Sequence, residues 1–600
     1  MPVQVSYPGV YIEEIPSGVR TITGVATSIT AFIGRTIRGD VNTPTTINSF
    51  GDFEREFGGL SVDYPLGYAV RDFYLNGGST AIIVRLYKAP ATATDATAQL
   101  TLDGLKLVAA SAGKWGQNLR LSMDIEVSDE VRTQLALQAT DLLFNLSVTD
   151  GKTTEKFSNL TLANTARRID RVLESSSNLV RWNGTFPGTV PDMPNGKSAA
   201  DKWKTLKDAT KALSTALAAN PQVPADVAAA KSALATAQTA YDTADALLVD
   251  PASKAETALA AALKANPQVP ADITAAQTAL TTALAAFKGD DGGALDDATY
   301  EGSENDKTGL FALAKADLFN LLCIPPDARD GDTSSTVNQA AMAYCQVRRA
   351  MLIVDPPSAW SANKDTAAAN AKKGLPDLGL TGESARNAAL YFPRVIESDP
   401  LRSGQSDTFV PCGIVAGVMA RTDSSRGVWK APAGLDAALN GIQGLDVNLN
   451  DAENGILNPL GINCLRFFPA SGRVVWGART LRGADQLADE YKYVPVRRLA
   501  LYIEESLYRG TQWVVFEPND EPLWAQIRLN VGAFMHNLFR QGAFQGQSPK
   551  DAYFVKCDKE TTTQNDIDLG IVNIVVGFAP LKPAEFVVIQ LQQIAGQIET

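Results

Sequence analysis

The chain has 600 residues, more than one hydrophobic core can organise, so about three or four domains are expected. Its formal net charge of −12 argues against nucleic acid as the main partner, because phosphate binding requires a basic surface. No apolar run has membrane-spanning length, and the start, MPVQVSYPGV, lacks the regions of a signal peptide, so we expect synthesis in a cytoplasm without membrane insertion.

The first 25 residues are predicted to form a short linking arm. Tyr7-Pro8-Gly9 is a turn signal, and Val10, Tyr11 and Ile12 follow it as a β-prone stretch. Proline and glycine bracket this stretch, and no apolar segment nearby supplies it with a core. Residues 10–12 are therefore candidates for pairing with another chain.

Residues 26–90 have the pattern of a small α/β unit. The stretch 27–36, TSITAFIGRT, alternates as a half-buried strand does, and 81–87, AIIVRLY, is typical of a buried strand. Between them a helix is predicted over 61–76, with Pro65 in its first turn and Gly77-Gly78 at its end.

The composition changes between residues 91 and 315. Residues 91–197 carry moderate strand signals between polar turns, which predicts a β-rich or α+β domain. Residues 198–315 begin Ala-rich, and the octapeptide Ala-Asn-Pro-Gln-Val-Pro-Ala-Asp occurs at 219–226 and at 265–272, an offset of 265 − 219 = 46 residues. Each copy is expected to end one helix at its prolines and to cap the next with its aspartate, Asp226 or Asp272. Two helical hairpins and a linker at 289–293 are therefore predicted.

The α/β pattern returns at residue 316 and continues to residue 490. Strands are predicted at 318–324, 350–355, 388–395 and 473–479, and helices at 338–349 and 412–420. The second helix is rich in small residues and is expected to pack closely on a sheet. Because the pattern resumes after an interruption, residues 26–90 and 316–490 are expected to form neighbouring or shared units.

Residues 491–600 are predicted to form a compact α/β module that ends in an apolar strand. Helices are expected at 496–509 and 521–540, and strands at 512–517, 552–557, 566–580 and 584–593. In the last strand Val587 and Ile589 lie on one face, while Phe586 and Val588 make the other face apolar as well. Such a strand, with no inward charge or interior proline, offers unpaired N–H and C=O groups to other strands.

Two β-prone chain ends allow copies of the chain to join head to tail by strand addition. Such a contact is heterologous, and it produces a helical filament if its rotation does not close. The alternative is that both ends fold onto their own domain. The residue pattern by itself leaves both possibilities open.

The sequence contains no recognisable catalytic, cofactor or metal motif. His536 is the only histidine, and Ser548, the one serine after it, lacks the glycines of a nucleophile elbow. Gly151-Lys152-Thr153 and Gly196-Lys197-Ser198 lack the upstream glycine of a phosphate-binding loop. The five cysteines are far apart, which predicts reduced, buried thiols rather than a zinc site. We therefore predict no enzyme activity, no catalytic residue, no cofactor and no metal ion.

Motifs in two separated parts of the chain resemble those of tail sheath proteins from contractile bacteriophages and phage-tail-like injection particles. In the first part they are Tyr-Pro-Gly-Val-Tyr-Ile-Glu-Glu at 7–14, Phe-Ile-Gly at 32–34 and Gly-Gly at 77–78. In the second part they are Gly-Ile-Asn at 461–463, Trp-Gly-Ala-Arg-Thr-Leu at 476–481, Arg497-Arg498, Tyr-Ile-Glu at 502–504, Phe-Glu-Pro-Asn at 516–519, Trp524, Gly-Ala-Phe at 542–544, Gly546 and Ala-Pro-Leu-Lys-Pro-Ala-Glu-Phe at 579–586. The resemblance covers about 1–90 and 316–595 and does not extend to 91–315.

The resemblance implies an α/β and α+β multidomain fold with strand-exchanging termini. Its parts would be a linking arm at 1–25, a first α/β segment of the sheath core at 26–90, an inserted β-rich or α+β outer domain at 91–197, an Ala-rich helical-hairpin insertion and linker at 198–315, the α/β sheath core at 316–490, and a C-terminal polymerisation domain with a donated strand at 491–600. The residues implied to link subunits are Val10, Tyr11 and Ile12 of the arm and Phe586, Val587, Val588 and Ile589 of the donated strand.

The resemblance also implies a mechanical function. Sheath subunits form a helical polymer of stacked rings around an inner tube, and contraction drives the tube through a target cell envelope. The implied partners are further copies of the chain, the inner tail tube protein, and baseplate and terminator or cap proteins, in a virion tail or contractile particle. Arg540, Lys550 and Lys556 are candidates for the tube contact. The alternative function is that of an outer-surface particle protein whose inserted domain binds or hydrolyses glycans.

Overall fold

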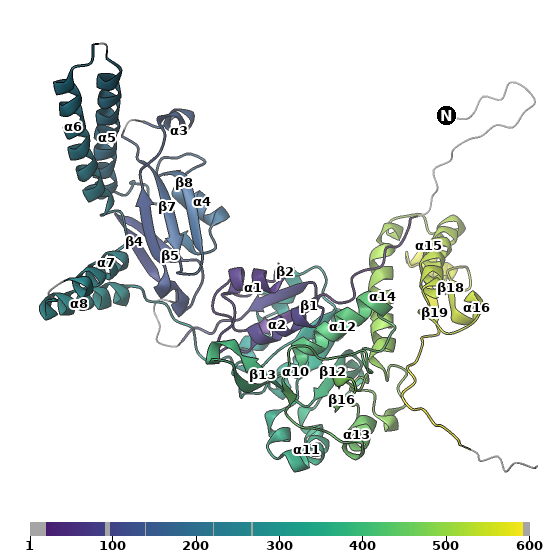
Figure 1. The fold of residues 1–600 in the computed structure, drawn as a ribbon. Coiled ribbons are helices and arrows are strands. Elements are labelled where there is room, and N and C mark those ends of the chain that lie inside the picture. Colours follow the sequence, from purple (N-terminus) through teal and green to yellow (C-terminus); the bar gives the residue numbers. More distant parts are fainter. Residues whose placement is uncertain (1–19, 91–95, 139, 220, 266–267, 592–600) are drawn as a thin grey trace, which may run out of the picture.

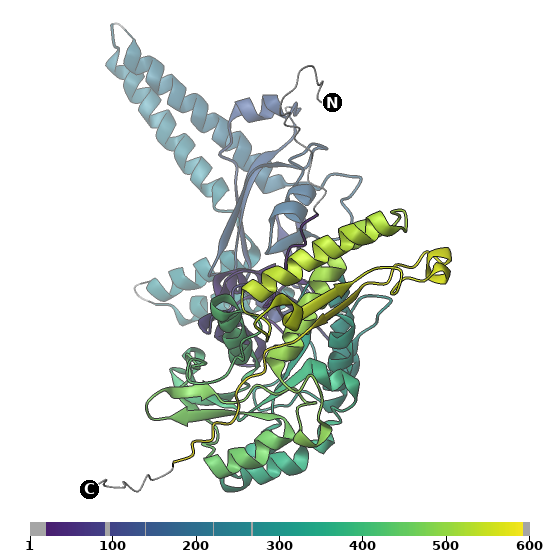
Figure 2. The ribbon, with the colours of Figure 1, turned by 90° about the vertical axis from the view of Figure 1, so that its right-hand side faces the viewer.

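A computed structural model describes residues 20–90, 96–138, 140–219, 221–265 and 268–591 (Figure 1). The predicted linking residues Val10, Tyr11 and Ile12 lie outside these described ranges. The molecule is elongated, with a central domain, an outer part that ends in helical hairpins, and a C-terminal part on the other side of the centre (Figures 1 and 2).

The central domain is built on an eight-stranded sheet that joins two distant parts of the sequence. Its order is β17-β16-β12-β11-β10-β1-β3-β2. The strands are β1 (Thr30–Gly34), β2 (Thr45–Ile47), β3 (Ala81–Arg85), β10 (Leu321–Cys323), β11 (Met351–Val354), β12 (Ala388–Phe392), β16 (Ile462–Phe468) and β17 (Gly472–Val475). β1 pairs in parallel with both β3 and β10, so that Thr30 lies between Ala81 and Leu321. Residues 26–90 and 316–490 thus share one sheet.

β1 is fully buried, and the expectation of a half-buried strand from its alternating pattern is wrong. Ala31 and Ile33 face a hydrophobic cluster that includes helix α10 (Ser335–Val347). Phe32 faces a second cluster that includes helix α12 (Cys412–Arg426). Helices cover both faces of the sheet, as is usual when most of its strands are parallel, so polar residues on alternate positions of β1 would have no access to water.

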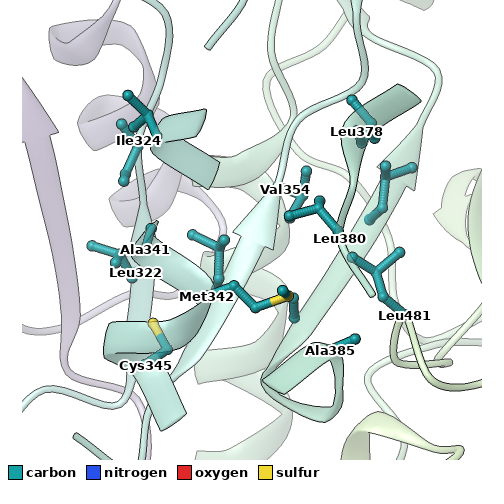
Figure 3. Close-up of a cluster of buried hydrophobic side chains, with 14 of the residues drawn as sticks. Leu322, Ile324, Ala341, Met342, Cys345, Val354, Leu378, Leu380, Ala385 and Leu481 are labelled. Atoms are coloured by element: carbon teal, nitrogen blue, oxygen red, sulfur yellow. The ribbon is translucent and has the colours of Figure 1, made fainter. Parts of the chain in front are cut away.

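The first of these clusters is the larger one and fills the space between the sheet and α10. Leu322 and Val354 of the sheet meet Met342 and Cys345 of the helix there (Figure 3). Cys345 is fully buried, and all five cysteines are buried and unpaired, which confirms the prediction of reduced thiols. The other helices of the central domain are α1 (Phe50–Phe57), α2 (Leu66–Leu75), α9 (Asp297–Glu301), α11 (Ala367–Gly374) and α13 (Asp451–Leu457).

Helix α12 approaches helix α2 very closely because of two glycines. A methyl group at Gly413 would lie 2.0 Å from the carbonyl oxygen of Ala69, and one at Gly417 would lie 2.6 Å from that of Phe73. The predicted small-residue helix at 412–420 is therefore confirmed, and it continues to Arg426.

The predicted strand at 388–395 is two strands in different sheets. β12 ends at Phe392, and β13 (Val395–Asp399) starts a three-stranded sheet with β14 (Gln405–Phe409) and β15 (Gly444–Leu445). Pro393 lies between them, and a proline has no N–H with which to continue a ladder. The prediction of a single strand at 388–395 is therefore wrong, because Pro393 divides this apolar run between β12 and β13.

The outer part of the molecule contains two small antiparallel sheets around one hydrophobic core. β4 (Gln99–Leu102), β5 (Leu105–Ala109) and β9 (Val180–Trp182) form the first sheet, and β6 (Arg120–Asp124), β7 (Leu143–Thr149) and β8 (Thr154–Thr161) the second. Helices α3 (Asp129–Gln134) and α4 (Ile169–Ser176) accompany them. Trp115 is buried in this core, and its indole N–H donates to the carbonyl oxygen of Ser111 at 3.2 Å.

The Ala-rich stretch forms four helices in two hairpins that project from the outer part (Figure 1). They are α5 (Pro194–Ala218), α6 (Pro224–Asp245), α7 (Pro251–Lys264) and α8 (Pro270–Ala286). The prediction that Asp226 and Asp272 cap the second helix of each hairpin is wrong, because Val223 and Val269 occupy those N-cap positions. In both copies the second proline of the repeat is the first helical residue, which places the aspartate inside the first turn.

The C-terminal part contains two long helices and a two-stranded sheet. Its elements are α14 (Val494–Gly510), α15 (Glu521–Arg540), α16 (Pro549–Ala552), β18 (Tyr553–Lys556), α17 (Gln564–Asp568) and β19 (Val575–Phe578). The predicted strand at 512–517 is wrong, because a short 3-10 helix, Gln512–Val514, leads into a turn in which Phe516 has a left-handed φ of 70°. The predicted strand at 566–580 is also too long, because Thr563 and Asp566 form a capping box that starts α17, and only Val575–Phe578 is a strand.

Candidate functional site

The chain ends in an apolar segment that has no partner inside the subunit. Phe586, Val587, Val588 and Ile589 are 73%, 81%, 82% and 77% exposed. Residues 581–591 contain no regular secondary structure and pair with no strand of the described chain. The strand predicted at 584–593 is therefore not formed within one subunit as far as it is described, because an extended segment needs a neighbouring strand to satisfy its backbone groups.

Immediately before this exposed segment, Glu585 is held by Arg479 and Asn458 of the central domain and by Tyr493, which directly precedes helix α14 of the C-terminal part. The guanidinium of Arg479 makes a bidentate contact with the Glu585 carboxylate: Nε donates to Oε1 and Nη2 donates to Oε2, each at 2.7 Å. Asn458 Nδ2 donates to Oε1 at 2.7 Å, and the Tyr493 hydroxyl donates to Oε2 at 3.0 Å. These four hydrogen bonds are called the Glu585 anchor below.

Electrostatics keeps Glu585 ionised in this anchor. Burial by itself raises the pKa of Glu585, but the hydrogen bonds from Arg479 and Asn458 outweigh it and hold the pKa below its ordinary value. Burial also raises the pKa of Tyr493 to about 12, so its hydroxyl stays protonated and remains a donor at neutral pH. A bidentate arginine–carboxylate pair of this kind is among the stronger polar contacts in proteins.

Arg479 is itself fixed to the central sheet. Its side chain is fully buried, and Nη1 donates to the carbonyl oxygen of Gly483 at 3.1 Å and to Asp485 Oδ1 at 3.0 Å. Its backbone N–H donates to Asn463 Oδ1 at 2.6 Å, and Asn463 Nδ2 donates to the carbonyl oxygen of Leu390 at 3.0 Å. Since Asn463 lies on β16 and Leu390 on β12, the anchor is connected directly to the eight-stranded sheet.

Residues 579–585 form a strap from the C-terminal part to the central domain (Figure 2). At its start the Gln545 N–H donates to the carbonyl oxygen of Ala579 at 2.9 Å, and Phe544 forms an isolated antiparallel β-bridge with Pro580. At its end stands the Glu585 anchor. Between these two attachments residues 581–584 line a cavity of about 890 Å³, together with Trp429 and Trp476.

The two-stranded sheet next to the strap has open edges. β18 and β19 pair antiparallel with each other, and neither has a second partner among the described strands. Helix α15 and Phe544 support one side of the sheet through a shared hydrophobic cluster. Phe554 and Val575 remain 50% and 44% exposed. Because sheets of only two strands are marginally stable, this one is suited to receive further strands.

The three basic candidates for a tube contact all lie at the surface of the C-terminal part. Arg540 is the last residue of α15, Lys550 lies in α16 and Lys556 ends β18. All three are exposed. A contact of these residues with an inner tube stays a prediction.

A pair of buried carboxyl groups, Asp72 and Glu397, lies elsewhere in the central domain. They are 3% and 1% exposed, and Arg71 contacts both of them. Burial, and for Glu397 also the nearby Asp72, raises the pKa of each carboxyl above its ordinary value. Because so little of either group reaches the surface, we assign the pair a structural role rather than a catalytic one.

This pair leads to a pH-dependent prediction. A carboxyl that keeps its proton in the folded chain and loses it on unfolding makes stability fall with rising pH, by about 1.4 kcal/mol per pH unit. For Glu397 the fall starts at its ordinary value of 4.5 and continues up to its raised folded pKa. In urea titrations between pH 6 and 9, the free energy of unfolding of Glu397→Gln is therefore expected to fall less steeply with pH than that of the wild type. The two slopes should differ by roughly 1.4 kcal/mol per pH unit, the contribution of one proton.

The control for that experiment is Glu490→Gln, whose side chain is 72% exposed. Its stability is expected to follow the wild type at each pH. An unchanged slope in Glu397→Gln would contradict the assignment of the proton to this pair.

No part of the chain that the structure describes carries a cluster of histidine, cysteine, aspartate and glutamate side chains suited to a metal ion. Within the same ranges, none of the helices combines the length and the apolarity needed to cross a membrane.

The Glu585 anchor and the open β18–β19 sheet were not predicted from the sequence. Arg479 belongs to the Trp-Gly-Ala-Arg-Thr-Leu motif and Glu585 to the Ala-Pro-Leu-Lys-Pro-Ala-Glu-Phe motif, so the resemblance includes both residues, but it assigns neither of them a role. They are 106 residues apart in the chain. One sequence signal points to this position: Glu585 stands directly before the apolar run 586–589.

Comparisons with known proteins agree with the motifs. The family model of the phage tail sheath protein central domain matches residues 304–481, and that of the phage tail sheath C-terminal domain matches residues 488–594. The curated tail sheath protein of Vibrio phage KVP40 is 27% identical over 176 residues, which make up 29% of this chain. The match covers only 25% of the length of that relative.

Two solved structures extend the comparison. A chain in the baseplate of the anti-feeding prophage in its contracted state is 32% identical, with 47% of this chain and 74% of that chain covered and a TM-score of 0.38. The sheath tail protein of Listeria innocua is 12% identical, with 94% of this chain and 96% of that chain covered and a TM-score of 0.52. The second comparison indicates a shared fold.

Proposed function

The chain belongs to the family of contractile tail sheath proteins, and we propose that it is a structural subunit that polymerises helically around an inner tube. Contraction of the polymer would drive the tube through a target cell envelope. Its partners would be further copies of itself, the inner tube protein, and baseplate and terminator or cap proteins. The matched family models describe sheath domains and give no support to a glycan-binding or hydrolase function.

One observation supports this function most directly: the subunit has an unpaired apolar segment and an open sheet at the same end of the chain. Residues 586–591 are exposed beyond Glu585, and β18 and β19 leave their outer edges without strands in the described chain. In one subunit the strap leads residues 586–591 away from its own β18–β19 sheet (Figures 1 and 2). The segment of one subunit would therefore add to the β18–β19 sheet of the next, with backbone hydrogen bonds as the main contact.

The N-terminal arm would make a second link of the same kind. The described chain starts at Arg20, whose N–H donates to Asn530 Oδ1 at 3.1 Å on α15 and whose guanidinium lies 4.8 Å from the Trp513 ring centre. Arg20 is thus attached to the C-terminal part, from which strands would be exchanged, while Val10, Tyr11 and Ile12 precede it in the sequence, outside the described residues. Two links per subunit would keep the array continuous while subunits move as rigid bodies.

The remaining parts have roles that follow from their positions. The β-rich domain and the helical hairpins extend away from the central domain on the side opposite the C-terminal part (Figure 1). If the C-terminal part faces the inner tube, the insertion at 91–315 forms the outer surface of the sheath. Arg540, Lys550 and Lys556 would then face the tube.

Electron microscopy of the purified full-length protein tests this proposal. We expect long hollow tubes at high protein concentration, because each subunit carries both a donor segment and an acceptor sheet. Deletion of residues 1–18 is expected to leave a folded monomer with a wild-type circular dichroism spectrum but few or no tubes. Monodisperse monomers of the full-length chain under all assembly conditions would overturn the proposal.

A further inference from the structure

The connection between the acceptor sheet and the donated segment is short. β19 ends at Phe578, and the exposed segment starts after Glu585, so that 585 − 578 = 7 residues join them. Any tension on residues 586–591 would travel along these residues toward β19. Apart from the Glu585 anchor, the backbone hydrogen bonds nearest to the pulled end are two at Ala579: its carbonyl oxygen accepts from the Gln545 N–H at 2.9 Å, and its N–H donates to the carbonyl oxygen of Ala552 at 2.8 Å. Both hold the strap to the C-terminal part only.

Without a further attachment, tension on the donated segment would open the acceptor sheet of the same subunit. The hydrogen bond closest to the pulled end opens first, and the pairs between β19 and β18 would follow one after another, starting at Phe578 and Tyr553. Since the same sheet is proposed to hold the strand of a neighbouring subunit, a pull on the donor end would weaken the acceptor end. Tension would then break the links of a subunit to both of its neighbours, the one that receives its segment and the one that donates to its sheet.

The Glu585 anchor lies between the exposed segment and β19, so tension on the segment reaches the anchor first. It holds the chain one residue before the exposed segment, through two bonds from Arg479 and one each from Asn458 and Tyr493. Arg479 is fully buried and connects through Asn463 to two strands of the central sheet. A parallel sheet with helices on both faces is a far more resistant support than a two-stranded sheet.

We propose that the Glu585 anchor transfers the tension of the donated strand to the central sheet and so protects the β18–β19 sheet of the same subunit. This inference rests on the strand donation proposed above. Glu585 and Arg479 are in this view positioning residues: they decide which domain of the donor subunit moves together with the donated strand. The central domain moves with it, and the C-terminal part is free to follow its own neighbours.

The test compares tubes of the full-length Glu585→Gln variant with wild-type tubes. Glutamine keeps the size of the side chain but removes its charge and replaces one acceptor oxygen with an amide donor. The bidentate pair with Arg479 is therefore broken, while residues 586–591 remain. Tubes are expected to form, but after a fixed shear treatment their mean length should fall about tenfold, since breakage depends exponentially on the barrier. Hydrogen exchange of residues 575–579 in the tubes should speed up by about the same factor.

Two further variants make the result specific. Asp485→Asn removes the charge of another partner of Arg479 but leaves all four bonds to Glu585, and its tubes should match wild type in length and exchange. Tyr493→Phe removes one bond of the anchor and should give a smaller decrease in tube length, which also serves if Glu585→Gln fails to assemble. Wild-type length and exchange in both Glu585→Gln and Tyr493→Phe would overturn the proposal.

Deletion of residues 586–600 separates this inference from the function on which it rests. If the deletion leaves tubes intact, strand donation fails, and the anchor has no tension to carry. If the deletion abolishes tubes but Glu585→Gln behaves as wild type, strand donation stands and only the role of the anchor fails.

Discussion

A chain that lacks residues 586–600 is expected to fold normally and to form no tubes. Phe586 and the residues up to Gln590 are exposed, so their removal takes away little packing and should shift the free energy of unfolding by less than about 0.5 kcal/mol. Assembly, in contrast, would lose its donor strand. Circular dichroism and thermal melting measure the first effect, and electron microscopy with sedimentation measures the second.

Point substitutions refine that experiment. A Val587→Asp, Ile589→Asp double variant places two charges on one face of the segment, where an added strand would pack on a neighbour, and should raise the concentration needed for assembly at least about tenfold. The matched control is Gln590→Ala, which changes the exposed polar side chain next to Ile589. Tubes of normal length from the truncated chain would show that the segment does not link subunits.

The second large effect, on the free energy of unfolding, is expected near the N-terminus of helix α14, where Arg498 and Asp423 form a buried ion pair. Their side chains are 3% and 4% exposed, Nη1 donates to Asp423 Oδ1 at 2.9 Å, and Nη2 donates to Oδ2 at 2.6 Å. Nη2 also donates to the carbonyl oxygen of Thr27, at 2.9 Å. The pair therefore joins α14, α12 and the segment that precedes β1.

Arg498→Ala is expected to lower the free energy of unfolding of the central domain by about 3–5 kcal/mol, because it leaves the buried Asp423 carboxylate without its partner. Urea denaturation, with hydrogen exchange in α12 and α14 to locate the loss, measures this effect. The double variant Arg498→Met, Asp423→Leu removes both charges and should recover most of the stability. A loss below about 1 kcal/mol in Arg498→Ala would contradict a structural role for the pair.

Helix α15 shows where local sequence sufficed. It was predicted at 521–540 and is found at Glu521–Arg540. Asp520 accepts a hydrogen bond from the Leu523 N–H as N-cap, and Pro522 lies in the first turn. Each of these signals acts within one helical turn, so no distant residue is needed to place them.

Strand predictions failed where a distant partner decides the outcome. The predicted run at 566–580 becomes a strand only at Val575–Phe578, where β18 pairs with it. The strand predicted at 318–324 is confirmed but shortened to β10, Leu321–Cys323, where β1 and β11 pair with it. Backbone hydrogen bonds in sheets join residues far apart in sequence, and a local pattern contains no information on them.

Local signals in the chain were enough to predict the family resemblance, the two Ala-rich hairpins, the long helices and an apolar segment near the C-terminus, because composition, caps and short motifs act over short stretches. The sharing of one sheet by residues 26–90 and 316–490 and the binding of Glu585 by Arg479 across 106 residues depend on the folded chain as a whole. Contacts of that kind arise when the folded chain buries a charged group and must give it a partner, and the identity of that partner is fixed by the fold rather than by any neighbouring residue.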